Sequence, residues 1–349
     1  MKMKKTVALI FGGEGYESEI SEMSAKALSS LIDKELYDIL YIHIHKDGSW
    51  YIYSSPCEEY IRSENAKPTQ TFPVKLGEKS GFISNGTVIP VCCAIPCLHG
   101  DFGEDGTVQG ALSLAHIKYV GQDVYASAIT SDKAYTKLAA EHLGIPTAKW
   151  ILSSKEDIAS ARKRAEEKIG YPMFIKPTRL GSSHGAHPVY EKKDFDAAFY
   201  DAMRYDSRIL IEALIPIEYE LECALFDDGE RVLCPGGRVI SGGRFYDYSS
   251  KYKSSDSPKT EAKSGVFPEI EKKIYEYSEA LAELIGIKHL SRLDFFVTGD
   301  GQVYFNEINT FPGMTETSLY PRLTEDMGLG RGDFINLLIA KVCADGRRI

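Results

Sequence analysis

The sequence lacks any apolar run that could cross a membrane, and it has no excess of basic charge. A membrane-spanning helix takes roughly 20 consecutive apolar residues, and no run in this chain approaches that length. The formal net charge of -9 disfavours a nucleic-acid partner, because a phosphate backbone needs a basic face. The composition still permits binding of a nucleotide, which needs only a few well-placed Lys and Arg residues.

Cysteine is sparse and follows no scaffold pattern. The seven Cys are an odd number scattered over 349 residues, which predicts reduced thiols and a cytoplasmic location. Cys93, Cys97 and His99 approach the spacing of a metal site. Their apolar neighbours predict a buried strand, in which Cys packs as a small hydrophobic residue. We therefore expect no zinc site.

A signal peptide, a dinucleotide fingerprint and an internal repeat are also missing. The basic start MKMKK is followed by an apolar stretch at residues 7–11, which is too short for a signal peptide and predicts a buried first strand. Gly12 and Gly13 lack the G-x-G-x-x-G spacing that would favour an NAD-dependent oxidoreductase. No similarity recurs at a period of about 20 to 50 residues.

Strand-like and helix-like segments alternate from the start of the chain. Residues 6–13 and 37–45 predict strands and residues 21–32 a helix, which together make a βαβ opening. The polar stretch 241–264 is too irregular for a core element and predicts a lid. We expect three lobes, 1–125, 126–211 and 212–349. Further helices are predicted at 131–142, 153–169 and 268–286, and further strands at 88–100, 171–177, 208–215, 290–297 and 302–309.

The strongest local signal is the strand pair SRLDFFV and VYFNEINT. Alternate residues of a strand share a face, so Arg292 and Asp294 are expected to point one way. By the same rule Phe305, Glu307 and Asn309 form one row, which changes from apolar to carboxylate and amide at its end. These oxygens suit Mg²⁺, and two carboxylates without a metal would repel one another. A solvated strand end with a surface Arg–Asp pair is the alternative.

A Gly/Ser-rich segment, KPTRLGSSHG, follows the predicted strand 171–177 and begins at Lys176. Gly and Ser let backbone N–H groups wrap an anion, and Lys supplies a point charge for phosphate. The pattern matches neither a Walker loop nor a dinucleotide fingerprint. A surface turn without a ligand is the alternative.

Two further segments combine polar and aromatic residues in loops. GRFYDYSSKYK places Lys251 and Tyr252 in the polar stretch, which favours a lid that excludes water, or else a loop with aromatics on its surface. In LHGDFGEDGTVQG, His99 leaves a strand at the position where ligands sit in open α/β sheets. A lone His is more often structural.

Taken together, these segments resemble the D-alanine–D-alanine ligases. The matching segments run in family order from residue 11 to residue 321: FGGEGYESEIS, LHGDFGEDGTVQG, SDKAYTK, FIKPTRLGSSHG, ILIEALI, FYDYSSKY, SRLDFFV and NEINTFPGMTETSLYP. The resemblance implies an α/β fold of the three-lobed ATP-grasp type with an N-terminal Rossmann-like, substrate-binding domain. It also implies ATP held between the central and C-terminal lobes, D-alanine as a substrate, and a homodimer.

The resemblance implies the following nucleotide and metal ligands. Lys133 and Lys176 contact the phosphates of ATP, with Ser183 in the loop beside them. Glu212, Ala213, Leu214 and Ile215 face adenine, and Glu220 the ribose. Asp294, Glu307 and Asn309 hold two Mg²⁺ ions, for which Mn²⁺ is an alternative.

It also implies a set of substrate contacts. Glu17 binds the ammonium of the first D-amino acid, with His99 near its carboxylate. Ser182 and Tyr252 form a hydrogen-bonded set with Glu17 that fixes the closed lid, to which Lys251 belongs. Arg292 and the Gly313 N–H stabilise the oxyanion, and Ser318 and Leu319 receive the second carboxylate.

Four residues depart from the common family pattern: Leu180, His184, Ala213 and Thr317. The first two adjoin Ser182 and Ser183, so they are expected to alter the geometry of the loop. Tyr252 and Leu319 favour D-alanine over D-serine or D-lactate as the second substrate, and a D-alanine–D-serine or D-lactate ligase is the alternative. A nucleotide-binding regulator without catalysis is a further alternative, opposed by the complete set of expected catalytic residues.

Overall fold

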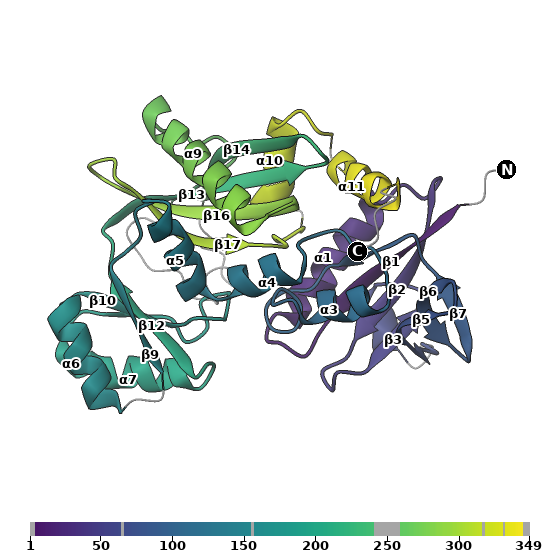
Figure 1. Ribbon diagram of the computed structural model, residues 1–349, viewed down its shortest axis with the longest axis horizontal. Coiled ribbons are helices and arrows are strands. Elements are labelled where there is room, and N and C mark those ends of the chain that lie inside the picture. Colours follow the sequence, from purple (N-terminus) through teal and green to yellow (C-terminus); the bar gives the residue numbers. More distant parts are fainter. Residues whose placement is uncertain are drawn as a thin grey trace.

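The computed structural model describes residues 4–63, 66–154, 157–240, 259–315, 318–330 and 332–344. In this part of the chain the strands form four sheets, and helices pack on their faces (Figure 1). The N-terminal sheet lies at one end of the molecule, and the four-stranded sheet and the second five-stranded sheet lie at the other end. The predicted mixed α/β fold is confirmed.

The N-terminal sheet is centred on β1, whose residues are all buried from Val7 onward. β1 runs parallel to β2 and β8 and is joined to β2 by α1, so the predicted βαβ opening is confirmed. A strand covered on both faces has to be apolar throughout, as residues 7–11 are. The elements are β1 (Lys5–Gly12), α1 (Ser18–Leu31), β2 (Tyr37–Ile44), β3 (Trp50–Tyr53), α2 (Glu58–Ile61), β4 (Thr69–Gln70), β8 (Cys93–Pro96) and α3 (Thr107–Leu114).

Residues 88–100 form two strands in different sheets, so the single predicted strand is wrong. β7 (Thr87–Pro90) belongs to a small antiparallel sheet with β5 (Phe72–Leu76) and β6 (Lys79–Ser84), whereas β8 pairs with β1. Between them the Cys92 N–H donates to the Thr6 carbonyl at 2.8 Å. Pro90 was the available signal, because Pro cannot continue a hydrogen-bonded ladder.

The four-stranded sheet is antiparallel, in the order β11-β10-β12-β9. The predicted helix 153–169 begins too early, because Ser153 and Ser154 complete β9. α6 starts at Ile158, where the Asp157 carboxylate accepts a hydrogen bond from the Ser160 N–H. The elements are α4 (Val124–Ser131), α5 (Lys133–His142), β9 (Trp150–Ser154), α6 (Ile158–Lys168), β10 (Met173–Pro177), β11 (His187–Val189), α7 (Lys192–Met203) and β12 (Arg208–Ala213).

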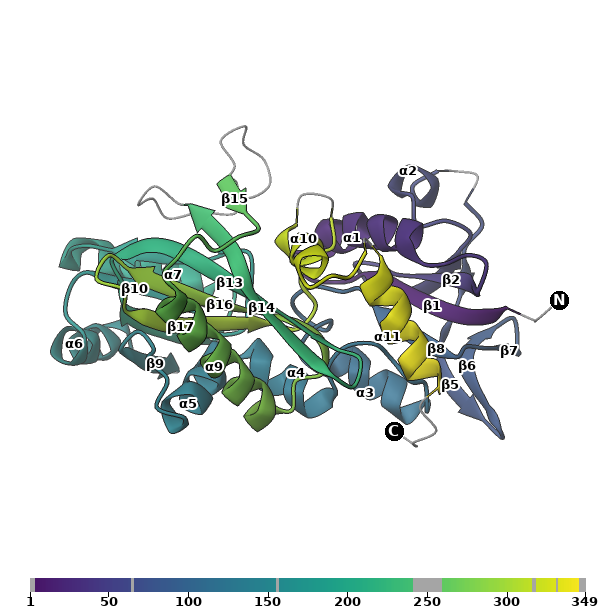
Figure 2. The same cartoon turned by 90° about the horizontal axis from the view of Figure 1, so that it is seen from above.

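The third large sheet carries the predicted strand pair. Its order is β15-β14-β13-β16-β17, and α9 packs along it (Figure 2). α9 begins with Pro268 and ends before Gly286, whose φ of +81° suits a helix C-terminus. The elements are β13 (Ile217–Asp227), β14 (Arg231–Ile240), β15 (Lys259–Glu261), α9 (Pro268–Ile285), β16 (His289–Thr298), β17 (Val303–Asn309), α10 (Leu319–Asp326) and α11 (Asp333–Ala344).

A β-bulge in β17 overturns the predicted row of side chains. Phe295 pairs with Phe305, but the preceding residue Asp294 pairs with Glu307, so Asn306 is an extra residue. Phe305 therefore stays in the core, while Glu307 lies on the opposite face with Asp294. The bulge separates the apolar and acidic parts of one strand, which strict alternation cannot do.

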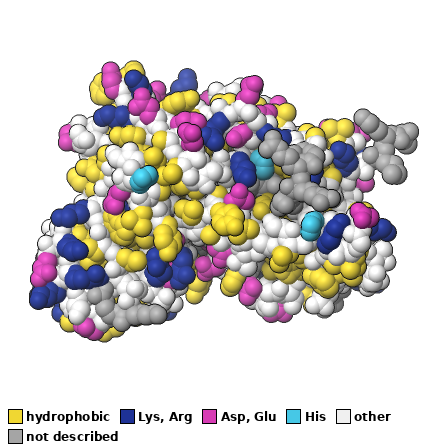
Figure 3. Space-filling model, in the orientation of Figure 1, with side chains coloured by type: hydrophobic (Ala, Val, Ile, Leu, Met, Phe, Trp, Pro, Cys, Tyr) yellow, Lys and Arg dark blue, Asp and Glu magenta, His cyan; other side chains and the backbone are white. Residues whose placement is uncertain are grey.

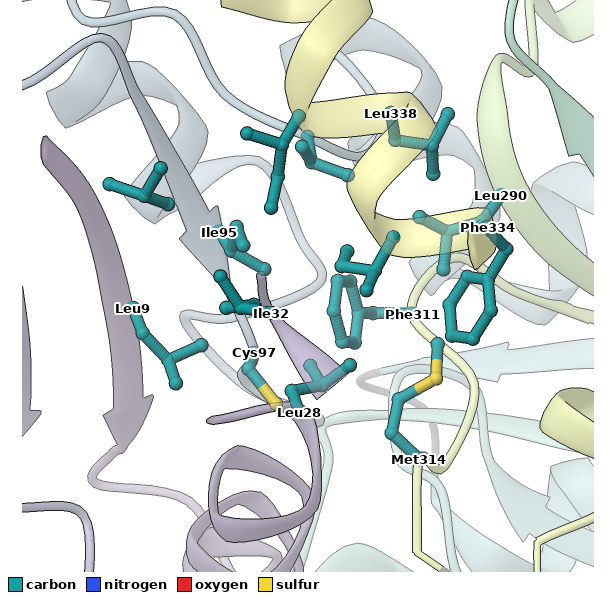
Figure 4. Packing of buried hydrophobic residues seen from close by; sticks show 14 of the residues in the cluster. Leu9, Leu28, Ile32, Ile95, Cys97, Leu290, Phe311, Met314, Phe334 and Leu338 are labelled. Atoms are coloured by element: carbon teal, nitrogen blue, oxygen red, sulfur yellow. The ribbon is translucent and has the colours of Figure 1, made fainter. Parts of the chain in front are cut away.

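The segment after β17 is anchored in a core shared by both ends of the chain. Phe311 and Met314 are only 4% and 2% exposed. They pack with Leu28 of α1 and Phe334 of α11, as Figure 4 shows. Burial of each such side chain contributes about 2 kcal/mol. The position of Gly313 is thus set by neighbours on both sides.

Cys92 and Cys343 form a disulfide with a Cα–Cα distance of 5.3 Å, so the prediction of reduced thiols is wrong for this pair. α11, which carries Cys343, packs against β8 and α1. That packing brings together two residues 251 positions apart. The spacing of the two cysteines along the chain did not predict that they would meet.

Reduction of the Cys92–Cys343 disulfide is expected to lower the melting temperature by several degrees. The bond closes a loop of about 250 residues, and releasing it raises the conformational entropy of the unfolded chain. Differential scanning fluorimetry with and without reductant measures the change, and Cys343→Ser should reproduce it. Cys57→Ser is the matched control, because Cys57 is not disulfide-bonded. Identical melting temperatures of the wild type with and without reductant would contradict this prediction.

The visible surface carries mixed charge. Figure 3 shows basic and acidic side chains interspersed with hydrophobic ones over one face of the molecule, and the basic ones are most frequent near α6 and α7. Among the described residues, no helix has both the length and the apolar character needed to cross a bilayer.

Candidate active site

Glu17 lies where three separate segments of the chain meet. It caps the N-terminus of α1 and is 8% exposed. Gly100 and Gly181 approach its carboxylate closely, since a Cβ on them would lie 2.7 and 3.1 Å from it, and the φ of +67° at Gly100 also favours glycine. The Ser182 hydroxyl donates a hydrogen bond to the same carboxylate. The structure thus brings together Glu17 and Ser182, as the sequence predicted.

His99 is linked to the Gly313 segment through α1. The Ser24 hydroxyl lies 3.2 Å from His99 Nε2 and accepts a hydrogen bond from the Met314 N–H at 3.4 Å. Ser24 is completely buried and was not predicted. The only sequence signal for Ser24 was its position three residues after Ser21, which places both serines on the same buried face of α1.

Ser318 and Leu319 begin α10 next to Gly313. A Cβ on Gly313 would lie 2.9 Å from the Ser318 hydroxyl. Ser318 is the N-cap of α10, and Leu319, its first residue, is 6% exposed. Helix N-termini attract anions, because their first N–H groups lack partners within the helix. The pair is therefore placed where a carboxylate could be received.

Glu104 joins the His99 loop to the segment that leads to Gly313. Its carboxylate accepts hydrogen bonds from the Gly100 N–H at 2.9 Å, the Phe311 N–H at 3.1 Å and the Thr310 hydroxyl at 3.2 Å. Burial raises the pKa of Glu104. Glu104 was not predicted, although it stands in the acidic loop GDFGEDG.

Asp294, Glu307, Asn309 and Arg292 form one cluster across β16 and β17. Asp294 is paired with Glu307, and Arg292 with Asn309. The Arg292 guanidinium donates two hydrogen bonds of 2.7 Å to Asp294, and the Asn309 amide donates one of 2.9 Å. The four predicted side chains are therefore close together.

Arg292 is held between two acidic groups. Besides Asp294, its Nε lies 3.2 Å from the Glu222 carboxylate, a partner that the sequence did not reveal. Burial alone would lower the pKa of Arg292, but Asp294 and Glu222 raise it well above its ordinary value. The guanidinium stays charged and fixed in orientation.

The acidic cluster fits a divalent cation. Asp294 and Glu307 supply carboxylate oxygens on one sheet face, and Asn309 adds an amide. Hard oxygen donors of this kind are those that Mg²⁺ takes in phosphoryl-transfer sites, together with water and phosphate. In the structure Arg292 and Lys133 neutralise the two carboxylates, with Lys133 Nζ 3.0 Å from Glu307.

A buried group of lysines adjoins the acidic cluster. Lys137 and Lys176 lie 3.0 and 2.6 Å from the Glu212 carboxylate. Burial would raise the pKa of Glu212, but the two lysines lower it to about 2. Burial and the neighbouring Lys137 lower the pKa of Lys176 despite Glu212. Counting Lys133, the three lysines exceed their two carboxylate partners by one charge, which suits an anion such as phosphate.

The Gly/Ser-rich loop closes over these lysines. Ser183 adjoins Ser182, and both have positive φ, +59° and +50°. Lys133 donates a hydrogen bond of 2.8 Å to the Leu180 carbonyl. Because the contact uses the backbone, the unusual side chain at position 180 leaves it intact.

The predicted adenine segment spans the end of β12, which includes Glu212 and Ala213, and the start of the connection to β13. The Ala213 N–H donates to the Lys149 carbonyl and the Leu214 N–H to the Pro172 carbonyl. Ile215 follows, and Glu220 lies on β13. The Glu212 carboxylate points toward Lys137 and Lys176. It therefore pairs with ammonium groups and does not face an adenine ring. Lys251, Tyr252, Thr317 and most of the predicted lid lie outside the described residues.

A cavity of about 290 Å³ lies beside these groups. Gly100, Lys133, Gly181, Glu307 and Asn309 line it. The two glycines approach the Glu17 carboxylate, so the cavity borders the surroundings of Glu17 as well as parts of the lysine and acidic clusters. An amino acid held by Glu17 would therefore lie near a phosphorylated ligand held by the lysines.

Comparison with known proteins agrees with this geometry. Residues 6–122 match the family model of the D-Ala D-Ala ligase N-terminus, and residues 139–340 that of the C-terminus. The chain belongs to the D-alanine–D-alanine ligase family. A D-alanine–D-alanine ligase of Ruminiclostridium cellulolyticum is 36% identical over 96% of this chain and 94% of its own length. One of Caldicellulosiruptor bescii is 34% identical over 99% and 97%.

Solved structures of the family have the same fold. The VanG D-Ala:D-Ser ligase from Enterococcus faecalis superimposes with a TM-score of 0.85 at 33% identity, covering 97% of this chain and 100% of that one. The D-alanine–D-alanine ligase from Coxiella burnetii gives 0.84 at 28% identity, covering 97% and 94%. A D-Ala:D-Ser ligase and a D-alanine–D-alanine ligase thus both occur among its structural relatives.

Proposed function

We propose that this protein is an ATP-dependent ligase that joins two D-alanine molecules for peptidoglycan precursor synthesis in the cytoplasm. The observation that carries the proposal is one cavity lined by Lys133, Glu307 and Asn309 and by the two glycines that approach the Glu17 carboxylate. A carboxylate is a poor electrophile, and phosphorylation by ATP gives it a good leaving group. Acidic and basic groups around one cavity fit an amino acid and ATP as the two reactants.

The first half-reaction is assigned to the lysine and acidic clusters. Lys133 and Lys176 would hold the phosphates of ATP, and Asp294, Glu307 and Asn309 would hold Mg²⁺, which would offset charge on the transferring phosphoryl group. Glu17 binds the ammonium of the first D-alanine and directs its carboxylate into the cavity. Attack of that carboxylate on the γ-phosphorus gives D-alanyl phosphate and ADP.

The second half-reaction is assigned to Arg292 and the Gly313 segment. The amine of the second D-alanine attacks the acyl carbon, and phosphate leaves with one former carboxylate oxygen. Arg292 and the Gly313 N–H meet the oxyanion that develops. Ser318 and Leu319 receive the carboxylate of the second D-alanine at the start of α10. His99 lies near the first substrate, held by Ser24.

The second candidate is a ligase that uses D-serine as acceptor. The observation that favours it is the fold shared with the VanG D-Ala:D-Ser ligase at 33% identity. Leu319 opposes it, because a buried aliphatic side chain beside the acceptor site offers a serine hydroxyl no hydrogen bond. We therefore prefer D-alanine.

Tyr252→Phe is expected to shift acceptor preference toward a hydroxy acid. The tyrosine hydroxyl is proposed to complete the hydrogen-bonded set with Glu17 and Ser182, which positions the acceptor amine. The ratio of kcat/KM for D-alanine to that for D-lactate measures the shift. Tyr246→Phe, a nearby tyrosine with no proposed role, is the control. An unchanged ratio would count against this role for Tyr252.

Release of ADP with Mg²⁺-ATP and D-alanine tests the proposed function, with products identified by mass. ADP and D-alanyl-D-alanine from D-alanine alone support it. If D-alanyl-D-serine is the main product when both acceptors compete, the protein is a ligase whose preferred acceptor is D-serine. ATP binding without ADP release for any acceptor would establish the regulatory alternative instead.

A further inference from the structure

The Gly/Ser-rich loop over Glu17 is defined here as residues 181–185. It has two consecutive non-glycine residues in the left-handed region, Ser182 and Ser183. Such a backbone persists only when its surroundings hold it. Within the loop and its edge the hydrogen bonds are long: the His184 N–H donates to Gly181 at 3.3 Å and the Ala186 N–H to Ser183 at 3.4 Å. Contacts from outside the loop must therefore fix its shape.

One such contact is a cluster of aromatic rings that we call the aromatic clasp: Tyr16, His184 and Tyr205. The His184 ring lies 5.5 Å from Tyr16 and 5.9 Å from Tyr205, and the two tyrosines are 5.5 Å apart, centroid to centroid. These are the separations of interacting aromatic pairs. Each ring comes from a different segment, so the clasp joins the loop to its two neighbours.

Tyr205 gives the clasp a fixed base. It follows α7, its N–H donates to the Ala202 carbonyl at 3.1 Å, and the Arg204 guanidinium lies 5.9 Å from its ring centroid. Gly185 approaches the same ring so closely that a Cβ would lie 2.6 Å from it. Both the backbone and the imidazole of the loop thus rest on Tyr205.

The clasp and the Glu17–Ser182 hydrogen bond join the same two segments. Tyr16 directly precedes Glu17, and His184 lies two residues beyond Ser182. The ring contacts therefore add a second link between the two segments that the hydrogen bond already joins. Tyr16 is 57% exposed, so burial alone does not explain its position over His184.

We propose that His184 is a positioning residue that acts through its ring: with Tyr16 and Tyr205 it holds loop 181–185 over Glu17 in the geometry that receives the first D-amino acid. The loop clasp rests on the structure alone, whereas its role in substrate binding rests on the proposed function. His184 touches no reacting atom. Its effect reaches the substrate through Ser182 and Glu17.

Three substitutions separate the ring from its polarity. His184→Ala removes the ring, His184→Asn keeps a polar amide without any ring, and His184→Phe keeps a ring without polar nitrogens. Ala and Asn are expected to lower kcat/KM for D-alanine about tenfold, mainly through KM, because about two aromatic contacts are lost. The KM for ATP should stay within about twofold, and Phe should restore most of the loss.

Two further variants complete the design. His142→Ala is the matched control, an exposed histidine at the end of α5 that has no part in the clasp. Its kinetics should equal those of the wild type. Tyr16→Leu should resemble His184→Ala, and the loss in the double variant should be smaller than the sum of the two single losses, because both substitutions break the Tyr16–His184 contact.

Amide hydrogen exchange of residues 181–186 in the ligand-free protein tests the clasp independently of catalysis. His184→Ala should speed exchange there and His184→Phe should restore it, with other regions unchanged. Wild-type exchange rates in His184→Ala would overturn the clasp, whatever the activity. Faster exchange with unchanged KM for D-alanine would overturn its role in binding. An inactive wild type would instead contradict the proposed function and leave exchange to judge the clasp.

Discussion

Glu307→Gln is expected to lower kcat/KM at limiting Mg²⁺ by at least about a hundredfold. Glu307 faces Asp294 across the bulge and pairs with Lys133 at 3.0 Å. The amide keeps the size of the side chain but removes the charge that offsets a divalent cation. A loss of about 3 kcal/mol from metal-assisted charge stabilisation corresponds to this factor. ADP release, measured across a Mg²⁺ titration, reports it.

Glu283→Gln controls for removal of a carboxylate elsewhere in the same lobe. Glu283 is exposed on α9, away from the cavity. It should leave both the rate and the Mg²⁺ dependence unchanged. Wild-type rates for Glu307→Gln at limiting Mg²⁺ would show that this carboxylate holds no essential ion.

Arg292→Lys should lower kcat about a hundredfold while the KM for D-alanine changes by less than about threefold. Lys keeps the positive charge between Asp294 and Glu222, so the variant retains charge balance in the buried cluster. It lacks the planar fork that donates two 2.7 Å hydrogen bonds to Asp294 and orients the remaining N–H groups. The oxyanion exists only in the transition state, so the loss falls on kcat.

Arg231→Lys is the matched control for this substitution. Arg231 lies in the same sheet and pairs with Glu279 at 2.9 Å, outside the cavity. Steady-state kinetics of both variants, with melting temperatures to compare stability, separate chemistry from folding. A large rise in KM without a fall in kcat would show that Arg292 contributes to ground-state binding and not to stabilisation of the transition state.

Local pattern predicted most elements of the fold. The apolar residues 7–11 and the helix starting at Pro268 carry their own signals, a run without polar residues and a Pro with a closing Gly. The bulge at Asn306 carries no such signal, and the break at residues 91–92 is marked only by Pro90, because both depend on which strand pairs with which. Tertiary pairing decided these two positions.

The candidate site divides in the same way. Asp294, Glu307 and Asn309 were visible from the sequence because they are polar residues within two largely apolar strands. The roles of Glu17 and Gly313 came from the family resemblance rather than from spacing. Glu104, Lys137 and Glu222 were missed, since their contacts join distant residues, as far apart as the 207 positions between Glu104 and Phe311.

The central claim is that this cavity activates a D-alanine carboxylate by phosphoryl transfer. The most direct measurement uses D-alanine labelled with ¹⁸O in its carboxylate and analyses the phosphate released with Mg²⁺-ATP by mass spectrometry. One ¹⁸O atom is expected in each phosphate, because the acyl phosphate breaks at the bond between its acyl carbon and the bridging oxygen. Unlabelled phosphate would mean that water attacks ATP, and it would contradict the acyl-phosphate mechanism.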